Sequence, residues 1–173
     1  DITFTSTIND TDGSSPFSLT LDSDGGAIDV QGIIGGTNKV GAISINNTGG
    51  DGSVTLAGIG NASGNSNAGA AGNEGLVNIG NTASATVNFG GGFYMTDGAT
   101  VIKAKSGGTG ENINFSAATT FKTVNDNLTF GTSAIDLANG ANLTVNTGSG
   151  NIILTDIHGA SAETVSITST GTV

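Results

Sequence analysis

Four aspartates near the N-terminus have the residue type and spacing that could bind a metal ion. They form two D-x-D-G turns, Asp10-Thr11-Asp12-Gly13 and Asp22-Ser23-Asp24-Gly25. Carboxylates on alternate residues of a tight turn offer oxygen ligands to a hard cation, so the sequence predicts calcium at Asp10, Asp12, Asp22 and Asp24. Neither turn continues into a complete EF-hand loop, and an Asp-Gly corner held by its own side-chain hydrogen bonds is the alternative interpretation.

Residues that could catalyse a reaction are few, because the chain has no arginine, four lysines and one histidine. Lys103 and Lys105 occupy alternate positions after Ile102, and we expect them to point outward from a strand. We interpret His158 as a corner residue, because the corresponding position of a similar segment is the apolar Ile34. Glycoside hydrolysis needs two carboxylates a few ångströms apart. A non-enzymatic protein is therefore the prediction, and a carbohydrate-active enzyme is the disfavoured alternative.

The charge of the chain excludes several classes of partner. Fourteen acidic residues against four lysines give a formal net charge of −10. Nucleic-acid binding depends on neutralising phosphates, so we expect no nucleic acid, and the same argument applies to anionic membrane surfaces. No apolar run reaches the roughly 18 residues of a spanning helix, which predicts no membrane insertion. The absence of cysteine excludes a disulfide framework and thiolate metal sites.

Short strands are the elements that must position these residues. Between Asn112 and Ile167, apolar pairs such as Leu128/Phe130 and Leu143/Val145 recur about every seven or eight residues. A small or polar residue separates the members of most pairs, which is the period-2 pattern of a strand with one buried face. Gly, Asn, Asp, Ser and Thr fill the intervals, as they do in turns. No segment has a 3.6-residue period, so we expect almost no helix.

The regular interval favours a solenoid. Three such strands per coil give a repeat of roughly 22 residues, within the range of solenoid proteins. The sequence predicts an all-β fold, a right-handed parallel β-helix (β-solenoid) with about three short strands per coil. It forms a single domain over residues 1–173, with a low-complexity loop at 61–75. The segment Gly150–Gly171 echoes Gly26–Gly50, as expected of a repeat protein.

A β-sandwich or jelly-roll fibre subunit is the structural alternative, with the same strands in two antiparallel sheets. Donor-strand exchange through Asp1–Asn9 would then join the subunits.

Residues 25–50 and 110–171 resemble the filamentous-haemagglutinin-like and autotransporter-passenger-like β-solenoids of large bacterial surface proteins. The resemblance is carried by GGAIDVQGIIGGTNKVGAISI, ENINFSAATTF, ANLTVNTGSGNIIL and ETVSITSTG. It implies extracellular display at the cell surface, a right-handed parallel β-helix, and adhesive or structural work.

Both ends of the chain, Asp1–Asn9 and Ser161–Val173, have strand-like patterns without a capping helix. Natural solenoids normally cap their ends, so we expect the partners to be copies of the chain or flanking solenoid segments of a longer chain. Surface glycans are a further candidate partner. The predicted function is a structural or adhesive building block of a bacterial surface adhesin or stalk. The alternative is a self-assembling subunit of an extracellular filament, pilus-like fibre or surface layer, joined by strand addition at its open ends.

Overall fold

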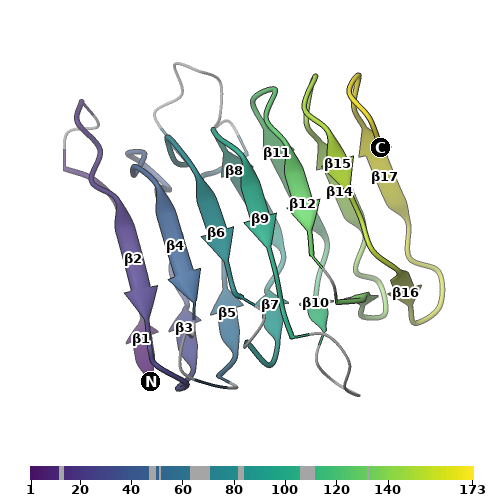
Figure 1. Ribbon diagram of the computed structural model, residues 1–173, viewed down its shortest axis with the longest axis horizontal. Helices are drawn as coiled ribbons and strands as arrows, with labels where there is room; N and C mark the ends of the chain where they lie inside the picture. The colour runs from purple at the N-terminus through teal and green to yellow at the C-terminus, as the bar shows by residue number, and fades with distance from the viewer. Residues whose placement is uncertain are drawn as a thin grey trace.

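The chain winds into a β-solenoid of about six turns, in which three parallel sheets run along the length of the molecule (Figure 1). The computed structural model describes residues 1–11, 14–46, 50, 52–62, 71–81, 84–105, 112–131 and 133–173. No helix occurs in these parts of the chain, so they contain no helical segment able to cross a membrane.

Each coil visits sheet A, then the sheet B side, then sheet C, and we number the coils from 1 to 7 by their sheet A strand. Sheet A contains β1 (Ile2–Phe4), β3 (Ile28–Val30), β5 (Val54–Leu56), β7 (Val87–Phe89), β10 (Ile113–Phe115), β13 (Ile135–Leu137) and β16 (Ile157–Gly159). Sheet B contains β8 (Gly92–Thr96), β11 (Thr119–Thr123), β14 (Leu143–Asn146) and β17 (Val165–Thr168). Sheet C contains β2 (Leu19–Asp22), β4 (Ile43–Asn46), β6 (Val77–Ile79), β9 (Thr100–Ile102), β12 (Leu128–Phe130) and β15 (Ile152–Ile153).

The strand pairing decides between the two predicted architectures. Every described pair of strands is parallel, and neighbours in a sheet come from successive coils. A sandwich joined by tight turns would need antiparallel pairs. The predicted parallel β-solenoid is therefore confirmed, and the β-sandwich or jelly-roll alternative is wrong.

Coil length differs between the two halves of the molecule. Ile113 pairs with Ile135, and Ile135 pairs with Ile157, a step of 22 residues. Ile2 pairs with Ile28, and Ile28 pairs with Val54, a step of 26 residues. The predicted repeat therefore fits the C-terminal coils, whereas the N-terminal coils are longer. Their sheet B side has isolated bridges in place of strands, linking Ile8, Ile34, Ile59 and Tyr94 in order.

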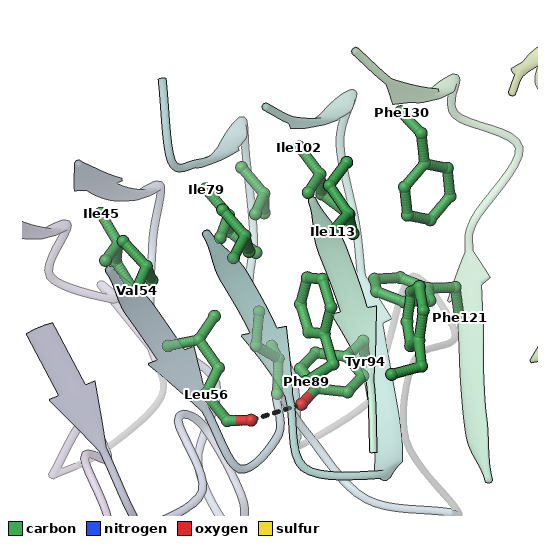
Figure 2. Close-up of a cluster of buried hydrophobic side chains, with 14 of the residues drawn as sticks. Ile45, Val54, Leu56, Ile79, Phe89, Tyr94, Ile102, Ile113, Phe121 and Phe130 are labelled. Atoms are coloured by element: carbon green, nitrogen blue, oxygen red, sulfur yellow. Dashed lines mark hydrogen bonds between the residues drawn. The ribbon is translucent and has the colours of Figure 1, made fainter. Parts of the chain in front are cut away.

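The core is one continuous column of inward residues, as alternation along each strand requires. In coils 4 and 5 the core contains five fully buried aromatic side chains: Phe89, Tyr94, Phe115, Phe121 and Phe130. Figure 2 labels four of them, Phe89, Tyr94, Phe121 and Phe130. Phe89 stacks on Phe115 with ring centroids 5.0 Å apart, and Tyr94 stacks on Phe121 at 4.8 Å. The Tyr94 hydroxyl donates a 2.7 Å hydrogen bond to the Leu56 carbonyl of the preceding coil.

Asparagine and aspartate side chains link successive coils just before the strands. Asn127 Oδ1 accepts the N–H of Asn151 at 2.8 Å, and Asn151 Oδ1 accepts that of Thr172 at 2.8 Å. Asp1 makes the same kind of bond at the other end, accepting the N–H of Ala27 at 2.7 Å. These side chains satisfy backbone donors at the corners, where the sheet ladders stop.

The echo between Gly150–Gly171 and Gly26–Gly50 does not keep its place in the sheets, because β15 belongs to sheet C and β3 to sheet A. The echo therefore repeats the strand-and-corner pattern and does not mark equivalent positions. At the third coil the inward pair is Val77/Ile79, whereas Leu76 points to solvent.

The predicted loop at 61–75 falls largely outside the described residues, because these omit residues 63–70. Its C-terminal part belongs to the rod. Ala71 and Asn73 are buried, and Asn73 forms a parallel bridge with Val40 of the preceding coil.

Candidate functional site

The described members of the predicted calcium set, Asp10, Asp22 and Asp24, belong to coil 1, at the N-terminal end of the solenoid. Asp10 is buried, and its Oδ2 accepts the Phe17 N–H at 3.0 Å, so this carboxylate closes the corner between Ile8 and β2. Asp12 lies outside the described residues. Asp10 therefore has a structural role at this corner.

The second turn follows β2 directly. Asp22 Oδ1 accepts the Asp24 N–H at 3.1 Å, as in an Asx-turn. Asp24 and Gly25 have positive φ angles of 48° and 98°, which set the tight corner leading to β3. Among the described residues, no three His, Cys, Asp or Glu side chains are grouped so that they could hold a metal ion. Calcium at these turns stays a prediction.

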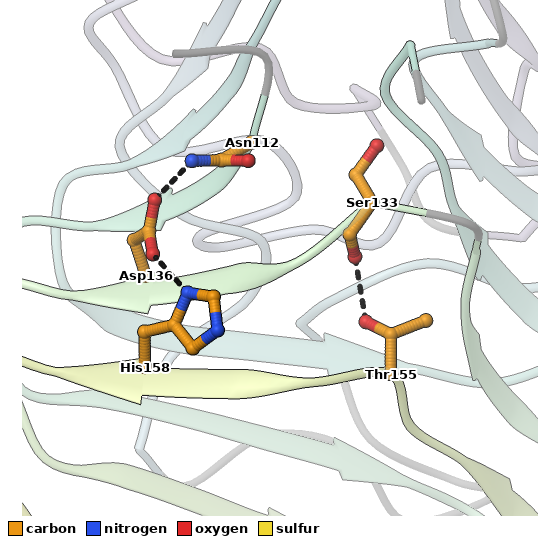
Figure 3. A network of polar contacts seen from close by, with 5 residues as sticks. All are labelled: Asn112, Ser133, Asp136, Thr155 and His158. Atoms are coloured by element: carbon orange, nitrogen blue, oxygen red, sulfur yellow. Dashed lines mark hydrogen bonds and ion pairs between the residues drawn. The ribbon is translucent and has the colours of Figure 1, made fainter. Parts of the chain in front are cut away.

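His158 lies at the centre of β16 rather than in a corner. Its register partner is Asp136, and its Nδ1 lies 3.3 Å from Asp136 Oδ1 (Figure 3). The Asn112 amide donates to the other oxygen of Asp136, so the carboxylate joins three successive coils on the outer face of sheet A. Comparison with Ile34 was misleading, because Ile34 is a buried residue of the sheet B side.

The lysines are placed as the alternation predicts. Ile102 and Ala104 are buried, whereas Lys103 is exposed and Lys105 is partly exposed. Lys103 leans across the next coil, since a Cβ on Gly131 would lie 2.8 Å from its Cγ.

A row of carboxylates lies on the corner between sheets B and C, and no motif in the sequence predicts it. Glu74, Asp97 and Asp126 come from coils 3, 4 and 5, and Asp126 Oδ2 accepts the Gly98 N–H at 3.1 Å. Partial burial raises the pKa of Asp97, nearby Asp126 and Glu74 raise it further, and Lys39 opposes them. Lys39 forms an ion pair with Glu74. Only the winding of the coils brings these residues together.

A hollow lies on sheet A, between β10 and β13. It has a volume of about 240 Å³ and is lined by Asn114, Phe115, Ser116, Asp136, Leu137 and Ala138. Its polar groups already have partners within the protein. Asn114 Nδ2 donates to Asn88 Oδ1 at 2.9 Å, and Ser116 Oγ donates to the Phe89 carbonyl at 3.2 Å.

The N-terminal end exposes residues whose register partners form the core. Phe4 pairs with buried Val30, yet 36% of Phe4 is exposed. Phe17, just before β2, is 42% exposed. β1 and β2 are the edge strands of sheets A and C, so the backbone groups on their outer side also lack a strand partner. This end is an apolar section of the core bordered by open sheet edges.

The C-terminal end is open in a different way. Val165 and Ile167 pair with buried Leu143 and Val145 and are themselves 39% and 36% exposed. β16 and β17 are the edge strands of sheets A and B here, whereas Ile152 in β15 donates its N–H to the Thr172 carbonyl at 2.8 Å. Glu163 lies in the corner between β16 and β17.

Comparison of the chain with protein-family models, with curated proteins and with solved structures finds no match. Function is therefore inferred from the fold and from the geometry of its two ends.

Proposed function

We propose that this chain is a non-enzymatic structural segment of an extracellular, cell-surface β-solenoid, a building block of a bacterial adhesin or stalk. The observation that supports the proposal best is the open N-terminal end, where Phe4 and Phe17 are exposed beside the edges of β1 and β2. Exposed edges of this kind accept further strands. The location follows from the resemblance to bacterial surface solenoids.

In this role the partners are flanking solenoid segments that continue the rod. The backbone pattern indicates how they would join. In sheet A, the first N–H of each strand donates to the carbonyl of the residue that precedes the next strand, as Ile135 does to Asp156 at 2.8 Å. For the adhesive part of the role, surface glycans are the proposed partner, and binding to a glycan array tests them.

Extension at the N-terminal end tests the proposal. Residues 113–155 placed directly before Asp1 would supply two further coils. The junction Thr155-Asp1-Ile2 then repeats the natural sequence Thr155-Asp156-Ile157. Because Phe4 becomes buried, we expect a higher melting temperature and a rod about 10 Å longer by small-angle X-ray scattering, at about 4.8 Å per coil.

A matched control carries serine at the inward positions Leu128, Phe130, Leu143 and Val145 of the added segment only. It should leave the melting temperature unchanged. In the intact extension, Phe4→Ala should destabilise more than in the original chain. A disordered extension that leaves melting unchanged would contradict the proposal. The same melting curves, recorded with calcium and then with a chelator, test whether the coil 1 aspartates bind calcium.

A further inference from the structure

The corner between sheets A and B differs between coils 6 and 7 at two inward positions. Leu137 pairs with Gly159 and Leu143 pairs with Val165, so both corners have the same length and Ala141 corresponds to Glu163. Leu137 and Ala141 are buried members of the core. Coil 7 therefore has a glycine and a glutamate where coil 6 has a leucine and an alanine.

Glu163 occupies the space that the missing side chain leaves. A Cβ on Gly159 would lie 2.7 Å from Glu163 Oε2. The carboxylate accepts the Ser161 N–H at 2.7 Å and the Gly140 N–H of coil 6 at 3.0 Å. The hydrogen bond from Ser161 is the main cause that lowers the pKa of Glu163 to about 2, so the group is ionised at neutral pH.

A coil stacked on this end would bury that charge. The surrounding inward residues Val165 and Ile167 are apolar. The inward residues of coil 1 that would meet them are apolar too, at Ile2, Phe4 and Ile8. The four lysines belong to coils 2, 4 and 5. No lysine would therefore compensate the carboxylate, and burying an unpaired charge is costly.

The backbone alone would permit such stacking. Leu143 donates its N–H to the Thr164 carbonyl at 2.9 Å, just as Ile135 donates to Asp156. By continuation of this coil-to-coil pattern, Ile157 and Val165 would donate to the carbonyls of Asp1 and Thr7 of a second copy. Inward-pointing charges are a known means of protecting such open sheet edges.

We propose that Glu163, folded over Gly159, is a cap that prevents the N-terminal coil of a second copy from stacking on coil 7. The inference rests on the proposed structural role but concerns the opposite end of the rod. It predicts that separate copies stay apart in solution, against the self-assembling filament as the alternative function.

The double variant Gly159→Leu/Glu163→Ala tests the cap, because it gives coil 7 the inward pair of coil 6. Gly159 is not among the glycines with positive φ, so its backbone accepts leucine. By sedimentation velocity we expect the unchanged protein to stay monomeric, and the variant to associate at least tenfold more strongly. Adding Phe4→Asp to the double variant should abolish that association, because it places a charge on the opposing face.

Glu163→Gln is the second variant, and it keeps the size of the side chain while removing the charge. We expect it to associate more strongly than the unchanged protein, and circular dichroism verifies that each variant is folded. The cap is disproved if the unchanged protein associates as strongly as the variants, or if Glu163→Gln and every other folded variant stay monomeric. Association that survives Phe4→Asp would also disprove it. The extension experiment tests the proposed function at the N-terminal end, whereas the cap variants change the C-terminal end. A negative result for the cap therefore does not contradict the proposed function.

Discussion

At the scale of single residues, Tyr94 shows how a thin core accommodates a polar group. It is fully buried between Phe89, whose ring lies edge-on with centroids 4.8 Å apart, and Phe121, which stacks on it. Its hydroxyl donates a hydrogen bond to the Leu56 carbonyl. Desolvation by burial is the main cause that raises the pKa of Tyr94 far above the ordinary value of 10.

Alkaline titration tests this burial. The chain has one tyrosine and no tryptophan, so absorbance near 295 nm reports on Tyr94 alone. Because the pKa of Tyr94 is raised in the folded state, burying its neutral phenol costs no deprotonation free energy below pH 10. Above pH 10 the unfolded chain loses this proton more readily than the folded chain, so the stability of the fold decreases as the pH rises. We expect no tyrosinate until the chain unfolds, as followed by circular dichroism. A reversible titration near pH 10 with the fold intact would show that Tyr94 is not buried as described.

At the scale of the elements, the corners are held by inward hydroxyl groups as well as by glycine. Thr123 Oγ1 donates to the Asp126 carbonyl at 2.6 Å, and Thr147 Oγ1 donates to the Gly150 carbonyl at 2.7 Å. Both threonines are buried one coil apart at the corner that leads from sheet B to sheet C. Their hydroxyls satisfy carbonyls that the sheet ladders do not reach.

The variant Thr147→Val measures how much one such corner hydrogen bond contributes to the free energy of unfolding. Valine keeps the shape but removes this donor, while Ser169 Oγ still donates to the Gly150 carbonyl at 2.7 Å. We therefore expect a loss of about 1 kcal/mol of unfolding free energy in urea. Thr144→Val is the matched control, because Thr144 is exposed on the adjoining strand β14. Its effect should stay within about 0.5 kcal/mol. Equal effects at the two positions would show that the corner bond contributes nothing.

At the scale of the whole molecule, stability should vary along the rod. The described strands pair with strands of the neighbouring coils, so a central coil has two stabilising interfaces and an end coil has one. The aromatic cluster reinforces coils 4 and 5.

Native-state hydrogen exchange tests this gradient. We expect the slowest amide exchange in β7, β10 and β11, and the fastest strand exchange in β1 and β17. Protection that is uniform along the chain would instead mean that the solenoid opens only as a single cooperative unit.

Much of the architecture follows from local sequence. Alternation in segments such as Leu143–Val145 sets the strand and its buried face, and Gly, Asn and Asp between the pairs set corners. These signals act within a few residues, so the sequence alone determined an all-β solenoid of short strands. It also indicated correctly that Lys103 points outward, because its neighbours Ile102 and Ala104 are apolar.

Tertiary structure decided what depends on contacts between coils. Corner lengths set the 26-residue and 22-residue steps, and those steps decide that Asp136 meets His158 and that Glu163 covers Gly159. A pattern of period two is the same on all three sheets, so it cannot tell which residues 22 or 26 positions apart will stack. For that reason the candidate sites at the ends and corners emerged only once the chain was wound.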